Sequence, residues 1–234
     1  MASTTLSVHQ KAIRSNVAKK AWMAITGLVL IAFLLMHMFG NLKIFVGPEA
    51  YNYYADWLKQ DLLYPILPHG WFIWIFRLVL VVCLVVHVYL MAVLWNSSLH
   101  GRGGKYVRKN RKEYTTSAKV MRWGGITLGA LLIFHLLMFT TGTITPGFSY
   151  ALHDPYDMFM GAFSQWWMVL IYAIFMAAVS MHVRHGFWSA FTTLGAHVGP
   201  GARTVLNVLA YFVAALLFVG FILPPLAVLF GMVS

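Results

Sequence analysis

Cysteine and acidic side chains are both scarce in this chain. Its 234 residues include one cysteine and six carboxylates, while 60% are hydrophobic and 10% are charged. With Cys83 as its only cysteine, the chain forms no internal disulfide and cannot by itself ligate an iron–sulfur cluster, which takes about four thiolates. So large an apolar fraction exceeds what one soluble domain buries in its core. Composition therefore predicts an integral membrane protein.

The few carboxylates all lie between the long apolar runs. They are Glu49, Asp56, Asp61, Glu113, Asp154 and Asp157. A proton- or ion-coupled transporter is expected to place carboxylates near the middle of the membrane, so the sequence disfavours that class. The formal net charge of +11 might point to nucleic acid, but the basic residues flank apolar runs and do not alternate with exposed aromatics. We expect no nucleic-acid partner.

Five apolar runs are long enough to cross roughly 30 Å of hydrocarbon as helices of about 20 residues. They lie near 21–40, 71–95, 123–142, 166–188 and 204–231. None alternates in the manner of a barrel strand, so the predicted fold is an all-α integral membrane protein with five transmembrane helices. We expect one membrane domain over 1–234, and a kink at Pro224 and Pro225 in the last helix.

Lysine and arginine alternate between the two sides that five spans define. They concentrate before the first span, in the second connection and around the fourth, whereas the first and third connections carry only Lys43 and Lys59. The larger group is Lys11, Arg14, Lys19, Lys20, Arg102, Lys105, Arg108, Lys109, Arg111, Lys112, Lys119, Arg122, Arg184 and Arg203. Because basic loops stay in the cytoplasm, we expect a multi-pass protein of a prokaryotic cell membrane. Segment 1–20 would be cytoplasmic and, lacking an apolar core with a cleavage site, would not be a cleaved signal.

Ionisable residues inside apolar spans are rare and mark functional sites. Each of the first four spans contains a histidine: His37, His87, His135 and His182. At about 1.5 Å of rise per residue, His37 and His135 lie in the outer half of the membrane, and His87 and His182 lie in the inner half. Each pair comes from alternate helices, which face each other diagonally across an up-down bundle. Since low-spin haem takes one imidazole on each side of its iron, the pattern predicts two b-type haems in a four-helix core, with a fifth helix outside it.

Other interpretations of these histidines stay open. A transmembrane histidine often serves only as a hydrogen-bond partner between helices. Zinc suits the pattern less well, because ligands on diagonal helices fit a wide planar group better than a small tetrahedral ion. His185 lies three residues after His182 and competes with it for the inner site; we prefer His182 because it lies deeper in the apolar run.

Small and basic residues near the two histidine levels are further candidates for haem contacts. Gly27, Gly124, Gly125 and Gly129 lie in the inner halves of the first and third spans, where they would admit a porphyrin or allow close helix packing. Arg77 is the only basic residue well inside a span. It would pair with a propionate of the outer haem or extend its charged end to the interface.

Two segments carry a resemblance to a known family. TGLVLIAFLLMHMFGNLKIFVGPEAYNYYADWL at 26–58 and MHVRHGFWSAFTTLG at 181–195 resemble the cytochrome b subunit of succinate dehydrogenase, in its five-helix, single-polypeptide, dihaem family. That family also includes the membrane subunit of some dihaem fumarate reductases. GNLKIF and GFWSAF are the most specific parts, and the spacing from His182 through Gly186 to Trp188 is similar to the family's fourth-span pattern. The resemblance extends from Ala18 to the last span.

The resemblance implies a role that the residues alone do not establish. Members bind a flavoprotein and an iron–sulfur protein on the cytoplasmic face and pass electrons between succinate or fumarate and a quinone, commonly menaquinone. It implies that His87 and His182 ligate the inner haem, and that His37 and His135 ligate the outer one. The chain would be the electron-transfer subunit of an oxidoreductase with no catalytic residue for succinate. The nearest rival is the dihaem cytochrome b of a hydrogenase or formate dehydrogenase, and a haem-free anchor is the simplest alternative.

Overall fold

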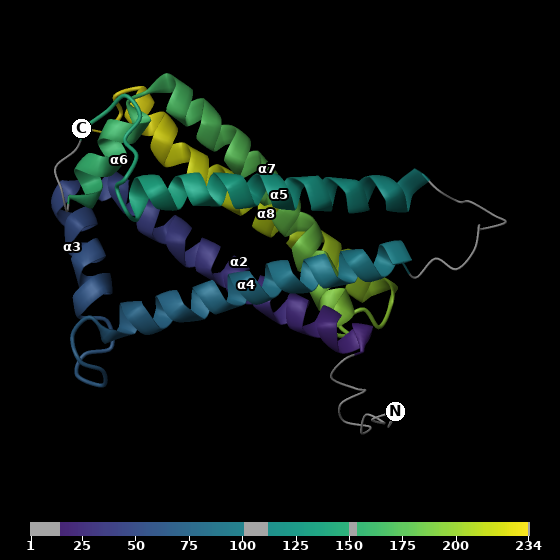
Figure 1. Cartoon of the computed structure of the whole chain (residues 1–234). Coiled ribbons are helices and arrows are strands. Elements are labelled where there is room, and N and C mark those ends of the chain that lie inside the picture. Colours follow the sequence, from purple (N-terminus) through teal and green to yellow (C-terminus); the bar gives the residue numbers. More distant parts are fainter. Residues whose placement is uncertain (1–14, 101–111, 150–153, 234) are drawn as a thin grey trace, which may run out of the picture.

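Every regular element in the described part of the chain is a helix. The computed structural model describes residues 15–100, 112–149 and 154–233. The five long helices are α2 (Asn16–Leu42), α4 (Trp71–His100), α5 (Lys112–Phe139), α7 (Trp166–Thr193) and α8 (Pro200–Leu229). The short ones are η1 (Lys43–Val46), α3 (Pro48–Gln60) and α6 (Pro155–Phe163). The predicted all-α architecture is confirmed for these residues (Figure 1).

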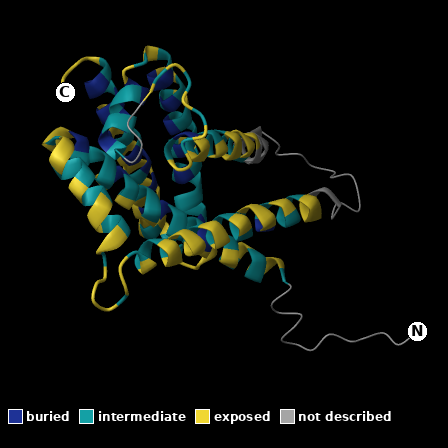
Figure 2. Ribbon diagram, turned by 60° about the vertical axis from the view of Figure 1, so that its left-hand side comes forward, coloured by how far each residue is buried: buried dark blue, intermediate teal, exposed yellow. Residues whose placement is uncertain are grey.

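Four of the long helices are long and apolar enough to cross a membrane. They cover Asn16–Val46, Trp71–Ser98, Trp166–Thr193 and Pro200–Leu229. Much of their apolar surface is exposed, most clearly on α4, where Leu78 is 64% exposed and Val85 60% (Figure 2). Water-soluble proteins rarely leave so extensive an apolar surface uncovered, so a membrane is the environment that fits these helices.

Helix α5 differs from the run predicted at 123–142. It begins in the preceding polar segment, and its apolar stretch is Trp123–Phe139. The helix ends at Phe139 because Gly142 adopts a φ of 64°, a conformation that glycine tolerates, and the Thr143 amide donates back to the Leu137 carbonyl. The helix thus ends three residues before the end of the apolar run at about 123–142.

Helices α2, α4, α5 and α7 form a four-helix arrangement, and α8 lies outside it. Helix α2 packs against α4 on one side and α7 on the other, and α7 also packs against α5. As a result α2 and α5 are diagonal partners, and so are α4 and α7. Helix α8 lies along α2 and α7, where the Met38 side chain occupies the space that a Cβ atom at Gly220 would need. Pro224 and Pro225 are buried inside α8, which continues past them to Leu229.

The two ends of the bundle differ in charge. Helices α3 and α6 lie together at one end, here called the α3/α6 end, with Lys43 and Lys59 (Figure 1). Lys19 and Lys20 at the start of α2 and Arg203 at the start of α8 lie at the opposite end, here called the basic end. Residues 1–14 of the predicted cytoplasmic segment and 101–111 of the basic second connection lie outside the described residues.

A polar clamp holds α3 and α6 together. The Asp154 carboxylate caps α6 by accepting from the Asp157 amide at 2.9 Å, and it accepts from the Asn52 side-chain amide at 2.9 Å. The Asn52 side-chain oxygen Oδ1 in turn accepts from the Tyr156 backbone amide at 3.0 Å. These bonds, the Asp157 amide first, hold the pKa of Asp154 below its ordinary value. Burial against Tyr156 and Phe159 raises the pKa of Tyr51 to about 12.

Replacing Asp154 with alanine tests this clamp. We expect the free energy of unfolding to fall by about 1–2 kcal/mol, since the change removes both a helix cap and the bond to Asn52. Denaturation of the detergent-solubilised protein at pH 7 measures the loss. Asp61→Ala is the matched control, because it removes an exposed ion pair with His69 at the same end and is expected to cost less than about 1 kcal/mol.

Lowering the pH provides a second test of the role of the Asp154 carboxylate. A lowered pKa means that ionised Asp154 contributes stability above the ordinary aspartate pKa and loses it as the pH falls through the lowered value. Asp154→Asn keeps the cap and should lose less stability than the wild type on acidification. Equal acid sensitivity of the two proteins would contradict this account of the clamp.

Candidate functional site

His37 and His135 meet in the half of the bundle nearer the α3/α6 end. His37 comes from α2 and His135 from α5, and their ring centroids lie 5.9 Å apart. Phe33 stacks on the His37 ring with centroids 5.3 Å apart, and Phe221 of α8 lies 5.7 Å from it. The His135 Nδ1 atom lies 3.2 Å from the Tyr172 hydroxyl. The pair thus has mainly aromatic surroundings and one hydroxyl contact.

His87 and His182 form the second pair, nearer the basic end. His87 comes from α4 and His182 from α7, and their ring centroids lie 6.4 Å apart. A Cβ atom at Gly27 would lie 3.1 Å from the His87 ring, so this glycine allows the ring to approach α2 closely. A Cβ atom at Gly125 would lie 4.0 Å from the His182 ring, which is ordinary contact. Both predicted glycines therefore border this pair.

The two pairs occupy different levels of the bundle. The His87 ring lies beside Gly27 of α2, and His37 follows ten residues later on the same helix. At the rise of an α-helix that separation is about 15 Å along the axis. The structure thus brings the four histidines together in the two diagonal combinations that depth alone predicts.

The hydrogen bonds of His87 determine which of its nitrogens is available. Its Nδ1 atom lies 3.1 Å from the Met23 carbonyl oxygen and 3.3 Å from the Thr26 hydroxyl. Because a carbonyl only accepts, Nδ1 carries the hydrogen in this arrangement, and Nε2 keeps a lone pair. A ligating histidine is commonly oriented in this way, with its second nitrogen donating to a backbone carbonyl.

The spacing of the rings fits axial ligation of one metal ion between each pair. Imidazole nitrogens bind transition metals such as zinc at about 2.0–2.1 Å, so two rings on opposite sides of one ion have centroids roughly 6 Å apart. The observed separations are 5.9 and 6.4 Å. The His182 Nδ1 atom is buried without a hydrogen-bond partner in the described structure, and such an atom needs a partner. Cβ atoms at Gly124 and Gly129 would meet nothing within 4 Å, so these glycines border open space.

The donor set suits haem better than zinc. Within residues 15–100, 112–149 and 154–233, no three His, Cys, Asp or Glu side chains gather to hold a metal ion. A structural zinc ion takes four protein ligands, whereas haem iron receives four from its porphyrin and needs only the axial two. Paired imidazoles at two levels match that requirement.

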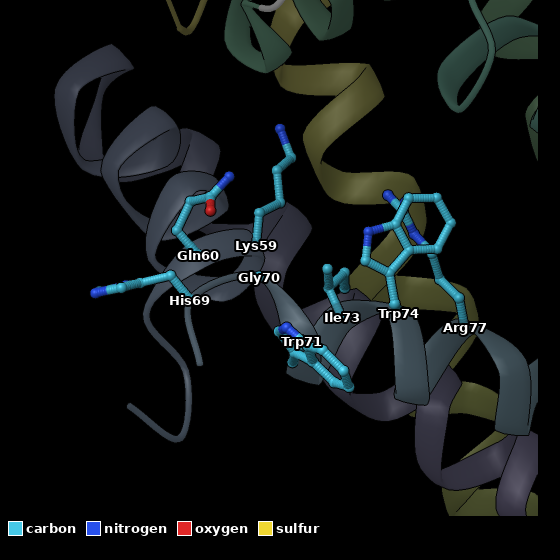
Figure 3. Close-up of a pocket in the computed structure, with 8 residues that line it drawn as sticks. All are labelled: Lys59, Gln60, His69, Gly70, Trp71, Ile73, Trp74 and Arg77. Carbon is cyan, nitrogen blue, oxygen red and sulfur yellow. The ribbon is translucent and has the colours of Figure 1, made fainter. Parts of the chain in front are cut away.

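Arg77 lies in a pocket at the surface. Its guanidinium is 4.9 Å from the Trp74 ring centroid, and its side chain is exposed. The pocket, of about 630 Å³, is lined by Lys59, Gln60, His69, Trp71, Trp74 and Arg77 (Figure 3). Phe76, the residue before Arg77, packs on Phe33 and so links this region to His37. The exposed position over a tryptophan favours the interpretation that Arg77 extends to the interface.

His185 occupies a different environment from His182. It lines a pocket between α7 and α8 with Arg184 and Trp188. His182 is the residue whose ring faces His87. The structure therefore pairs His182, and not His185, with His87.

Comparisons of the chain with protein-family models, with curated proteins and with solved structures found no match.

Sequence reasoning missed the residues that hold the rings in place. These are Phe33, Phe221 and Tyr172 around the first pair, and Met23 and Thr26 around the second. Thr26 and Tyr172 are polar residues inside apolar runs, which is the signal that would have singled them out. The role of the Met23 carbonyl has no sequence signal, since every residue carries a carbonyl group.

Single histidine replacements test the pairing. If each pair holds one haem, His87→Ala and His182→Ala remove the same spectral species, and His37→Ala and His135→Ala remove the other, because one axial imidazole alone does not keep low-spin iron. Reduced-minus-oxidised absorption spectra of the purified variants measure the loss. His185→Ala is the matched control and should keep both species. Loss of one common species from His87→Ala and His135→Ala would overturn the pairing.

Proposed function

We propose that this chain is the membrane-anchor cytochrome b subunit of a succinate:quinone oxidoreductase, in the five-helix dihaem family that its sequence resembles. The observation that carries the proposal is the pair of imidazole contacts, 5.9 and 6.4 Å between centroids, on diagonal helices at two levels. Helix-to-helix hydrogen bonding alone gives no reason for four histidines to meet in this way.

The proposal counts α5 as a span in addition to the four long apolar helices, which gives five spans in all. Its apolar stretch is Trp123–Phe139, and the preceding turns of the helix add length toward the basic end. The basic end would face the cytoplasm, following the rule that lysine and arginine stay inside. With five spans, the end of α8 would then lie outside the cell membrane, with the α3/α6 end.

The chain would hold one haem b at each histidine pair. A haem held by each pair of imidazoles would supply one-electron transfer. The Met23 carbonyl and Thr26 hydroxyl orient His87, and the Tyr172 hydroxyl orients His135. Gly27 gives the His87 ring room to adopt its position. The apolar side chains around both pairs exclude water, which adjusts the redox potential of a bound iron.

The remaining parts of the enzyme would belong to partners. A single cysteine means that an iron–sulfur relay has to come from another subunit. We expect an iron–sulfur subunit and a flavoprotein on the basic end, and a membrane quinone such as menaquinone as the electron acceptor or donor. The chain would carry no catalytic residue for succinate.

The same two pairs also suit the membrane subunit of a quinol:fumarate reductase, or the dihaem cytochrome b of a hydrogenase or formate dehydrogenase. The GNLKIF and GFWSAF segments favour the succinate and fumarate enzymes. The identity of the soluble partners separates these functions.

Isolation of the intact complex tests the function. The tagged chain, purified in mild detergent from the host that carries its gene, is expected to retain a flavoprotein and an iron–sulfur protein, and to reduce a quinone analogue with succinate. Copurification of a nickel or molybdenum enzyme would overturn the assignment in favour of a hydrogenase or formate dehydrogenase.

Crosslinking of the same preparation tests which end the partners contact. We expect crosslinks at residues 15–20 and 96–122, since a basic, polar platform suits a soluble partner. Crosslinks confined to 41–70 and 143–165 would instead place the partners on the α3/α6 end and reverse the proposed orientation.

A further inference from the structure

A second pocket lies on the outer surface of the bundle, between α7 and α8. Its volume is about 470 Å³. The side chains that define it are Arg184, His185 and Trp188 of α7 and Arg203, Thr204 and Asn207 of α8. None of the interactions described above for the two histidine pairs uses this pocket.

The pocket is strongly basic. Two guanidinium groups come from different helices, and the lining includes no carboxylate. The chain contains no Asp or Glu after Asp157, so neither α7 nor α8 supplies an internal counter-ion. The two arginines and the asparagine are donors suited to a phosphate group, which arginine binds through paired N–H bonds, whereas the Thr204 hydroxyl donates to the Pro200 carbonyl at 3.2 Å.

Arg184 is held in position by Tyr211. Its Nη2 donates to the tyrosine hydroxyl at 2.7 Å, and the guanidinium lies 4.3 Å from the ring centroid. A guanidinium has five N–H donors, and this bond uses one. Stacking reduces the mobility of a long side chain and therefore lowers the entropic cost of binding an anion.

The pocket faces away from the histidine pairs. Arg184 follows His182 by two residues, which places it about 200° around the helix at 3.6 residues per turn. Exposed apolar side chains lie close by, since Val208, which lines the pocket, is 60% exposed, and Met181, about one helical turn before Arg184, is 57% exposed. An anion bound here would thus lie on the membrane-facing surface, away from any group between His87 and His182.

The pocket lies near the basic end of the bundle, at the level expected for a lipid headgroup. Arg203 and Thr204 lie in the first turns of α8, at the basic end. Trp188 fits an interfacial position, where tryptophan is enriched. Basic pockets between transmembrane helices near the cytoplasmic side are typical sites for anionic lipid headgroups.

We propose that Arg184 and Arg203 form a binding site for the headgroup phosphate of an anionic phospholipid, with the Asn207 side-chain amide as a further donor. The acyl chains would lie along the exposed apolar surface of α7 and α8. The site depends on the chain spanning a membrane, but it does not depend on haem or on the soluble partners.

Lipid binding to the full chain tests this site. Native mass spectrometry of the detergent-solubilised protein would be titrated with phosphatidylglycerol and, separately, with phosphatidylcholine. Because each basic residue near a membrane surface strengthens anionic-lipid binding by several-fold, we expect phosphatidylglycerol to bind about tenfold or more weakly to the R184Q/R203Q variant. Phosphatidylcholine should bind both proteins weakly and alike.

Matched variants separate the site from general charge and from misfolding. K19Q/K20Q removes two positive charges from the same end, on α2, and should leave phosphatidylglycerol affinity unchanged. R184K/R203K keeps the charges but loses the paired N–H bonds and the contact with Tyr211, so it should bind phosphatidylglycerol more tightly than R184Q/R203Q and more weakly than the wild type. Absorption spectra of the same samples report separately on the histidine pairs, so failure of the lipid site and failure of the proposed function are distinguishable.

Three results would overturn the proposal. One is equal phosphatidylglycerol affinity of R184Q/R203Q and the wild type, and another is equal loss in K19Q/K20Q. The third is displacement of the lipid by millimolar inorganic phosphate, which would indicate a site for free phosphate. Phosphate without effect, together with selective loss in R184Q/R203Q, supports a lipid site.

Discussion

Imidazole pairing inside apolar helices is the constraint on which the rest of this structure depends. A histidine surrounded by hydrocarbon needs a partner for its polar nitrogens, because water is absent there. Each of the four helices α2, α4, α5 and α7 brings one such ring inward, and the rings meet across the diagonals of the bundle. The rings of each pair meet edge to face, and the glycine beside His87 and the hydroxyl contact of His135 accommodate this arrangement.

A membrane environment accounts for the large exposed apolar surface, which would favour aggregation of a water-soluble protein. Helix α4 has few buried side chains among those described, and its exposed apolar residues include Val79, Val81, Val82, Val85 and Val88. Lipid covers such a surface, so stability does not require a tightly packed exterior. Packing is concentrated instead where α7 and α8 meet α2, around Met38 and Leu217, and at the α3/α6 end around Phe159 and Phe163. Helix α4 contributes no described side chain to either cluster, whereas α5 contributes Met138 to the one around Phe159 and Phe163.

The sequence predicted the long helices and the histidine pairs well, because the first depend on the length of each apolar run and the second on the helical rise per residue. Apolar length identifies a span, and rise per residue gives depth, so His87 and His182 could be matched before any contact was known. It did not predict α3 and α6, although Asp154 before Pro155 is a helix-start signal that was overlooked. It left two alternatives open for Arg77, one of them the surface position, and it did not predict the contact of His87 with Met23, because these depend on how particular side chains pack.

Haem content tests the central claim most directly. The full chain, purified in detergent after expression with excess haem, would be assayed by the pyridine haemochrome method against polypeptide concentration from amino-acid analysis. Two diagonal imidazole pairs at two levels lead to two haems per polypeptide, both low-spin. One haem, or none, on a preparation that takes up no more would contradict the account of the paired histidines as axial ligands.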